Sequence, residues 1–373
     1  MFHLWKRKKF FIFTFILILL TVTLGSPNLQ IKAKSTTTTQ YNMKVHFIDV
    51  GQADCILIES NKKYMLIDAG NNEDEKLILT YLKKNKVKRL EYVIGTHPHE
   101  DHIGSLDAVI KNFEIGKVIL PEKEHTTQTF EDVLDAIEDK GLKITKPVVS
   151  KEYKLGTAKF IIIAPNADYK DELNDWSVGI KLINKNDGFI FVGDAEKEAE
   201  DDILKNDIDI SADVLKISHH GSDTSTSNAF LNEVSPSSVV ISCGKGNSYG
   251  HPNKTIINKL KKKKINIYRT DEQGTIVASS NGNKITWNIK PSSTYASGKL
   301  NTTPTPVPTS TSKPSGSETS KSTTYIVNKN TKKFHLTSCK SVKQMKESNK
   351  IKLKGTRKEA IKKGYSACKI CNP

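Results

Sequence analysis

The sequence has only one long apolar run, and that run lies at its N-terminus. Residues 10–24 follow the basic group Lys6-Arg7-Lys8-Lys9 and are fewer than the roughly 20 apolar residues that cross a bilayer. This pattern is typical of an export signal that ends near Gly25-Ser26 or Ala33, and no lipobox cysteine follows it. An uncleaved N-terminal anchor is the alternative. We therefore expect residues 1–33 to direct export and the remaining chain to be extracellular, with membrane association only if the leader stays uncleaved.

Large apolar side chains are also scarce between residues 291 and 324, where Ser, Thr and Pro dominate. Such a segment cannot bury enough surface to offset its ordering entropy, which predicts an extended linker. The linker separates a large segment, residues 43–290, from a small one, residues 325–373.

Across residues 43–290, short Val/Ile-rich runs alternate with helix-compatible stretches, and there is no internal repeat. The predicted strands are residues 45–48, 55–58, 64–67, 160–163, 189–192 and 239–241, and the predicted helices are residues 74–84, 130–140 and 196–205. This alternation predicts an α/β layered sandwich with one large core.

Positive charge is concentrated at the two ends of the chain. The formal net charge is +16, and residues 325–373 hold fourteen basic and two acidic side chains. Together with the basic leader, this segment accounts for the whole excess, so the region between them is neutral. The small segment is therefore expected to bind a polyanion, either DNA or a teichoic polymer of a bacterial wall. A merely solvated lysine-rich surface is the alternative.

Cysteine is sparse, and the five cysteines divide into two groups. Cys55 and Cys243 lie in apolar runs and are expected to be buried thiols. The other three lie in the small segment and, with one histidine, form two closely spaced pairs, His335 with Cys339 and Cys368 with Cys371. Four such donors fill a tetrahedral site, which predicts one structural zinc in a segment too small to fold on apolar burial alone. A disulfide between two of these cysteines is the competing interpretation.

The densest group of metal-type donors is His97-Pro98-His99-Glu100-Asp101-His102, directly after the apolar run 92–95. Imidazole and carboxylate donors at such short spacing favour zinc. They favour manganese where the other ligands are oxygens. A helix is expected to start at residues 103–106. A strand, a ligand-bearing loop and a helix in this order predict a catalytic metal loop.

Three further apolar runs end in donors of the same kind. Asp68 lies in Leu66-Ile67-Asp68-Ala69-Gly70, and Asp194 lies in Phe191-Val192-Gly193-Asp194-Ala195. His219 and His220 follow a third run, and their spacing does not decide which of them binds metal. Four strands that all end in metal donors predict one metal site, in which Asp194 would bridge two ions.

In this order, the donors resemble the metallo-β-lactamase fold, and in particular the C-terminal hydrolase domain of ComEC-type competence proteins. The resemblance covers residues 43–290 and includes segments 47–54, 68–70, 96–102, 174–177, 193–195, 216–222 and 249–252. It implies an αββα sandwich with the metal site at one edge of two facing sheets.

Two departures from the relatives bear on function. ComEC-type chains carry the domain on a polytopic channel, whereas one leader-length apolar run implies a free-standing exported hydrolase here. The third histidine that β-lactamases use for the first metal is replaced by Asn174-Asp175-Trp176-Ser177, as in the ComEC-like group. His125 is the only histidine between His102 and His219, and its polar neighbours predict a surface loop. The first site is thus poorer in nitrogen, which admits manganese as well as zinc.

The small segment resembles the Ada-type metal-binding module across nearly all of residues 325–373. The resemblance rests on Phe334-His335-Leu336-Thr337-Ser338-Cys339 and on the run from Ala360 to Pro373. His335 stands where the repair protein of that family has its methyl-accepting cysteine. Zinc binding and polyanion contact are therefore implied, and alkyl transfer is not.

The resemblance to the hydrolases implies a role for each donor. One metal would be held by His97 and His99. The other would be held by Asp101, His102 and either His219 or His220, and Asp194 would bridge the two metals. The candidate catalytic residues are Asp101, Asp68, Lys216 and His251, and Asp68 would orient a metal ligand. The candidate substrate-binding residues are Asn174, Ser177 and Ser222. Contact with a substrate phosphate, or support of the metal ligands, is expected of Lys216, Ser222 and His251.

These features predict an exported two-metal phosphodiesterase or nuclease that cleaves DNA through a metal-activated hydroxide. The alternatives are a phosphorylcholine-esterase-like enzyme acting on cell-wall teichoic acid, and a hydrolase of small esters or lactones. Choline-binding wall repeats are absent, which disfavours the first alternative. These features do not predict an oligomeric state.

Overall fold

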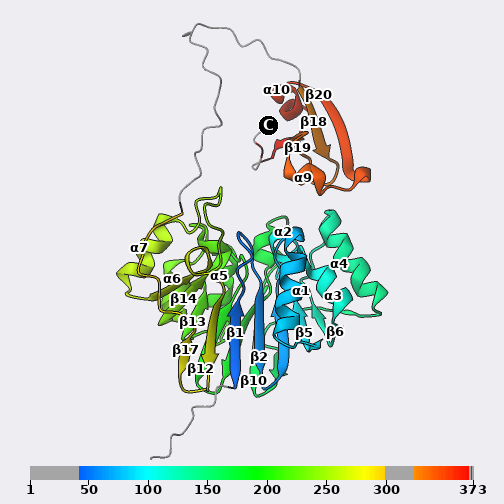
Figure 1. The fold of residues 1–373 in the computed structure, drawn as a ribbon. Helices are drawn as coiled ribbons and strands as arrows, with labels where there is room; N and C mark the ends of the chain where they lie inside the picture. The colour runs from blue at the N-terminus through cyan, green and yellow to red at the C-terminus, as the bar shows by residue number, and fades with distance from the viewer. Residues whose placement is uncertain (1–41, 299–322, 369–370, 372–373) are drawn as a thin grey trace, which may run out of the picture. The chain divides into compact units, whose positions relative to one another are not determined.

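A computed structural model describes residues 42–298, 323–368 and 371. The leader predicted at residues 1–33 and most of the predicted linker lie outside this range. Residues 42–298 form a large domain, and residues 323–368 with Cys371 form a C-terminal module (Figure 1). Within the described residues, no helix combines the length and apolarity needed to cross a membrane.

The first sheet of the large domain has eight strands in the order β17-β16-β1-β2-β3-β5-β7-β8. Their bounds are β1 Met43–Phe47, β2 Ile56–Ser60, β3 Lys63–Ile67, β5 Tyr92–Ile94, β7 Val118–Ile119, β8 Ile144–Thr145, β16 Ile276–Ser280 and β17 Ile285–Trp287. The strands from β17 to β3 pair antiparallel, and those from β3 to β8 pair parallel. A separate two-stranded pair consists of β4 Arg89–Leu90 and β6 Glu114–Ile115.

The second sheet has seven strands in the order β15-β14-β13-β12-β11-β10-β9. Their bounds are β9 Glu152–Leu155, β10 Ala158–Ala164, β11 Gly179–Asn184, β12 Asp187–Phe191, β13 Val214–Lys216, β14 Ser238–Ile241 and β15 Asn266–Arg269. This sheet is antiparallel from β9 to β12 and parallel from β12 to β15. Each sheet therefore contains a parallel part whose strands end at one common edge.

Helices cover the outer face of each sheet (Figure 1). The helices are α1 Glu75–Lys84, α2 Glu100–Ile103, α3 Leu106–Asn112, α4 Gln128–Asp139, α5 Lys197–Leu204, α6 Asn228–Val234, α7 Lys254–Lys262 and α8 Thr270–Gln273, with short 3-10 turns η1 Asn72–Asp74, η2 Leu173–Trp176 and η3 Ser218–Gly221. Helices α1, α3 and α4 share one buried apolar cluster with the first sheet. Helices α5, α6 and α7 share another with the second sheet.

The two sheets pack face to face over a third apolar cluster, rich in phenylalanine. The rings of Phe47 and Phe191, from opposite sheets, have centroids 6.1 Å apart. Along β3, Met65 and Ile67 point into this cluster while Leu66 joins the helix-covered one. Burial on both faces explains why the central strands are continuous apolar runs. The four layers confirm the predicted αββα sandwich.

The C-terminal module is built on a four-stranded sheet in the order β20-β18-β19-β21. Its elements are β18 Thr323–Asn328, β19 Lys333–Leu336, α9 Lys340–Lys343, η4 Glu347–Asn349, β20 Lys350–Gly355, α10 Arg357–Lys362 and β21 Ser366–Ala367. Two small apolar clusters lie on its faces, one around Tyr325, Val327 and Phe334 and the other around Ile326 and Cys339. So little apolar area gives the module a marginal core.

Candidate metal centres

The donors of the large domain lie where adjacent parallel strands end. Asp68 directly follows β3, and the loop that starts at Gly95 and carries His97 follows its neighbour β5. In the facing sheet, Asp194 follows β12 and His220 follows its neighbour β13. Because parallel neighbours end at the same edge of a sheet, both sheets deliver their donors to one edge of the sandwich.

A short helix that the sequence did not predict precedes the helix expected to start at residues 103–106. Helix α2 starts at Glu100 and contains Asp101 and His102, and Gly104 and Ser105 link it to α3, which begins at Leu106 within the predicted range. The link lies against the turn after β3: the Gly104 amide donates to the Gly70 carbonyl at 2.8 Å. A Cβ on Gly104 would lie 2.2 Å from the Asn71 carbonyl carbon, so only glycine permits this approach. The close contact interrupts the helix and brings the ligand loop to the Asp68 turn.

Four side chains form a compact group whose donor atoms all lie within 4.8 Å of one another: Asp101, His102, Asp194 and His220. His102 Nε2 lies 3.2 Å from Asp194 Oδ1, and His220 Nε2 lies 3.4 Å from Asp101 Oδ2. The other Asp194 oxygen, Oδ2, is 3.6 Å from His220 Nε2. Two imidazoles and two carboxylates at this spacing suit a divalent cation.

A second pair of donors adjoins this group. His97 Nε2 lies 2.9 Å from His99 Nδ1, so the two nitrogens face each other. The rings of His97 and His102 have centroids 4.2 Å apart, which places the pair beside the four-donor group. The assignment of one metal to His97 and His99 stays a prediction, with their facing nitrogens next to the other donors.

Buried atoms without partners show that the four-donor group fits a cation. His102 Nε2, His220 Nε2 and Asp194 Oδ1 are buried and have no hydrogen-bond partner. The opposite nitrogens are held, because His102 Nδ1 contacts Asp68 Oδ2 at 2.8 Å and His220 Nδ1 donates to the Ser242 carbonyl at 3.0 Å. Each ring thus presents a nitrogen lone pair to the centre, as a metal ligand with a fixed tautomer does.

Electrostatics within the group also favour a cation. Burial alone would lower the pKa of His102, but the carboxylates of Asp194, Asp68 and Asp101 raise it well above its usual value. The carboxylates thus attract positive charge to the site. In contrast, burial holds the pKa of His97 well below its usual value, and the neighbouring His102 lowers it further. His97 is therefore neutral at pH 7, the form in which an imidazole binds metal.

Asp68 uses both carboxylate oxygens within the protein. Its Oδ1 accepts from the Thr96 amide and its Oδ2 from the Thr96 hydroxyl, each at 2.8 Å, and Oδ2 also contacts His102 Nδ1. These bonds suit the predicted role of orienting a ligand. The backbone of Asp68 has φ of 58°, a left-handed conformation that aspartate tolerates better than most residues.

The two adjacent histidines point to different partners. Both have left-handed backbones, with φ of 50° at His219 and 53° at His220. His220 lies in the four-donor group, whereas His219 Nδ1 lies 3.2 Å from Glu196 Oε1 and its Nε2 is 3.8 Å from Asp194 Oδ2. The geometry therefore favours His220 as the ligand, which spacing alone could not decide.

Lys216 is buried away from solvent and pairs with Asp54, another buried residue. The second Asp54 oxygen, Oδ1, has no hydrogen-bond partner and lies 3.6 Å from His220 Nδ1. Lys216 thus forms an ion pair with Asp54, which in turn lies next to the metal donor His220. Sequence reasoning noted Asp54 only as part of a motif, because its partner is 162 positions away in the chain.

The candidate substrate-binding residues differ in their surroundings. Ser177 is buried; its Oγ accepts from the Asp194 amide at 3.0 Å and contacts His97 Nδ1 at 3.3 Å, so it braces the metal donors. Asn174 Nδ2 donates to Glu196 Oε1 at 3.0 Å, and Ser222 Oγ lies 2.9 Å from Thr224 Oγ1. The backbone of Gly193 lies so close to Ser177 that an added Cβ would be 2.8 Å from Ser177 Oγ.

Two more histidines lie at the margin of the site. The His251 ring has its centroid 5.7 Å from that of His219, and its Nδ1 lies 3.4 Å from Gln52 Nε2. His125 lies in a loop, as predicted, and is half-buried with its ring centroid 6.3 Å from that of His99. The sequence contained no signal that would place His125 beside His99.

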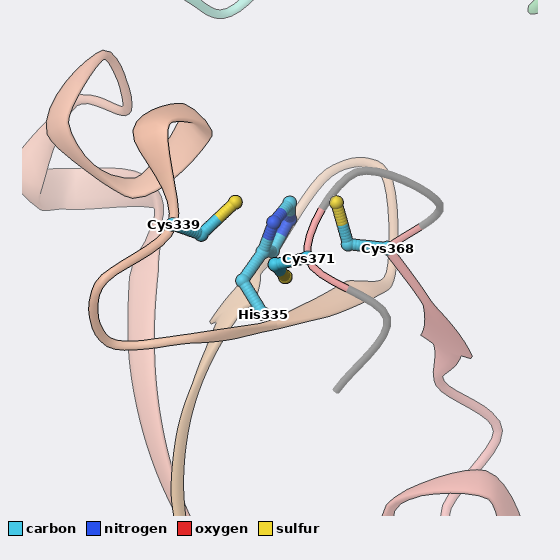
Figure 2. A group of neighbouring side chains, drawn as sticks. All are labelled: His335, Cys339, Cys368 and Cys371. Atoms are coloured by element: carbon cyan, nitrogen blue, oxygen red, sulfur yellow. The ribbon is translucent and has the colours of Figure 1, made fainter. Parts of the chain in front are cut away.

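In the C-terminal module, the predicted zinc donors converge. Figure 2 shows the side chains of His335, Cys339, Cys368 and Cys371 turned toward one another, and their donor atoms all lie within 4.8 Å. The three cysteines are free thiols, and His335 Nδ1 is buried without a hydrogen-bond partner. The Leu336 amide donates to Cys371 Sγ at 3.4 Å, but burial and the neighbouring Cys339 and Cys368 raise the pKa of this thiol to about 11, so a cation is needed to make it a thiolate ligand. One zinc fits this set, with no position left for a substrate.

Fold and site together define a metallohydrolase sandwich, and comparison with known proteins identifies its family. Residues 48–245 match the Metallo-beta-lactamase superfamily, so the chain belongs to that superfamily. Over 251 residues it is 29% identical to ComE operon protein 3 of Bacillus subtilis, covering 62% of this chain and 32% of that protein. It is 27% identical to Recombination protein 2 of Haemophilus influenzae over 238 residues, covering 62% and 28% of the two chains.

These relatives confirm the resemblance to ComEC-type proteins, and the chain spans about a third of their length. Among solved structures, the metallo-beta-lactamase fold protein YhfI from Bacillus subtilis is 13% identical, with a TM-score of 0.42, and the match covers 65% of this chain and all of YhfI.

We predict that His220→Ala removes one equivalent of divalent metal from the purified chain, because the four-donor group loses a ligand. His219→Ala is the matched control and should keep the metal content of the wild type, because its ring lies against Glu196. Metal analysis after dialysis against zinc or manganese measures both. Loss of metal from the His219 variant alone would reverse the assignment.

We also predict that the module binds one zinc through its four donors. Cys368→Ser should lower the zinc content by one per chain, whereas Cys55→Ala, which removes a buried thiol of the large domain, should leave it unchanged. Thiol titration gives a second measure, since a chelator should make three protected thiols reactive. Thiols found paired as disulfides would contradict the zinc site.

Proposed function

We propose that this chain is an exported two-metal phosphodiesterase that cleaves DNA. The observation that carries the proposal is the position of Asp194, whose Oδ1 and Oδ2 lie 3.2 and 3.6 Å from His102 and His220 while the His97–His99 pair adjoins the same group. When bound, two adjacent divalent cations, zinc or manganese, would activate a water and stabilise both the attacking and the leaving oxygen of a phosphodiester.

The residues of the chain itself would hold this centre rigid. Asp68 orients His102, and the Ser242 carbonyl orients His220. Ser177 fixes the Asp194 backbone and the His97 ring, at 3.0 and 3.3 Å. Because these supports are buried, the donors need not reorganise when substrate binds.

The names of the relatives favour DNA as the substrate. They are a recombination protein and a competence protein, besides ComE operon protein 3. The net charge of +12 in residues 325–373 supports contact with a polyanion, and export would place that contact outside the cell. The same charge suits a wall teichoic polymer, so a teichoic-acid phosphodiesterase associated with the cell wall is the second candidate.

We expect the full chain, loaded with manganese or zinc, to hydrolyse DNA faster than teichoic acid or a lactone. Asp101→Asn is the control: it keeps the shape of the side chain but loses a charged ligand, so hydrolysis should fall at least a hundredfold with the fold retained. Product formation on the substrate panel and a thermal melt measure the two effects. If the wild-type chain hydrolyses teichoic acid faster than DNA, the teichoic-acid phosphodiesterase replaces the DNA phosphodiesterase as the proposed function. If the Asp101→Asn variant hydrolyses substrate as fast as the wild type, the two-metal site is excluded.

A further prediction concerns the basic module, proposed to retain the enzyme on its polymer. The truncation should follow Gly298, because Arg269 bonds to Ala296 and the Gly298 amide donates to the Pro252 carbonyl at 2.8 Å. The shortened chain should turn over a small phosphodiester at the rate of the full chain. It should bind DNA more weakly and with a smaller salt slope, because fewer counterions are released. Equal affinity and equal slope in the two chains would contradict the retention role.

A further inference from the structure

A column of aromatic rings leads from the surface to the candidate metal centre. Tyr249 has 61% of its surface exposed, the highest fraction among the large apolar and aromatic side chains that the structure describes as exposed. Its ring stacks on His251, with centroids 5.6 Å apart and planes 26° apart. The His251 ring in turn lies edge-on to the ring of His219, with centroids 5.7 Å apart. His219 Nε2 is 3.8 Å from Asp194 Oδ2.

The loop that carries the two outer rings is held in place by side-chain hydrogen bonds. Asn247 Oδ1 accepts from the Tyr249 and His251 amides, at 3.1 and 3.0 Å. Asn247 Nδ2 donates to the carbonyls of His251 and Gly244, at 2.6 and 2.9 Å. The Gly244 amide in turn donates to Gln52 Oε1 at 2.9 Å. An exposed ring on such a braced loop is positioned in advance of binding and loses little entropy when a ligand stacks on it.

We propose that Tyr249, backed by His251, is a subsite that stacks one unpaired nucleobase of a single-stranded nucleic acid beside the scissile phosphodiester. The proposal rests on the proposed phosphodiesterase function and deepens it by naming the substrate class. Every base presents a π-face to a tyrosine ring, so such stacking tolerates any base sequence. The polyol phosphates of teichoic acid have no aromatic ring and would gain nothing from this surface.

The test compares the full manganese-loaded chain on two strands of equal length and charge, an oligothymidylate and a strand of abasic units. The wild type should cleave the oligothymidylate with the higher kcat/KM, and Tyr249→Ala should reduce that preference about tenfold, the effect of losing one base–ring stack. Tyr249→Phe keeps the ring and should keep the preference. Tyr295→Ala removes another exposed ring, one that lies 4.9 Å from the Lys261 ammonium, and should also keep it.

The outcomes separate this subsite from the enzymatic activity. Equal cleavage of the two strands by the wild type, or an undiminished preference in Tyr249→Ala, overturns the subsite while the phosphodiesterase stands. A wild type that cleaves neither strand overturns both. A preference lost in Tyr249→Ala and kept in Tyr249→Phe supports the stacked base.

Discussion

The burial of carboxylates beside imidazoles at one edge of the sandwich is the constraint on which the large domain depends. Asp68, Asp101 and Asp194 all act on His102, and two of them are almost fully buried. A buried negative charge is costly unless a positive partner lies within a few ångströms. The protein supplies imidazoles and leaves their inward nitrogens without partners, an arrangement that a bound cation would complete.

The donors lie in short segments that directly follow the ends of paired strands. Strands β3 and β5 in one sheet and β12 and β13 in the other are parallel neighbours, so their ends are fixed by backbone pairing. Strained positions complete the arrangement: His219 and His220 both have φ near +50°, a conformation that costs energy for non-glycine residues. A site built this way keeps ligands in place even before a cation binds.

Sequence reasoning could predict what depends on local pattern and spacing. The donor groups 97–102 and 219–220, the ends of the buried strands and the layered sandwich follow from residue types and their periodicity. The contacts of Lys216 with Asp54 and of Ser177 with His97 could not be predicted in this way, because they join residues 162 and 80 positions apart in the sequence. The choice of His220 over His219 and the short helix α2 depend on backbone angles that a list of donors does not contain.

The two metal sites would serve opposite purposes for physical reasons visible in their ligands. The group in the large domain combines carboxylates with imidazoles and adjoins a histidine pair that lacks a third nitrogen, which leaves coordination positions for water and substrate. The group in the module has three thiols and one imidazole, enough to complete a tetrahedron. The module also has two apolar clusters of only a few residues each, so the free energy of zinc binding would replace the burial that a larger core provides. A catalytic metal site in the large domain and a structural one in the module are therefore what these ligand sets favour.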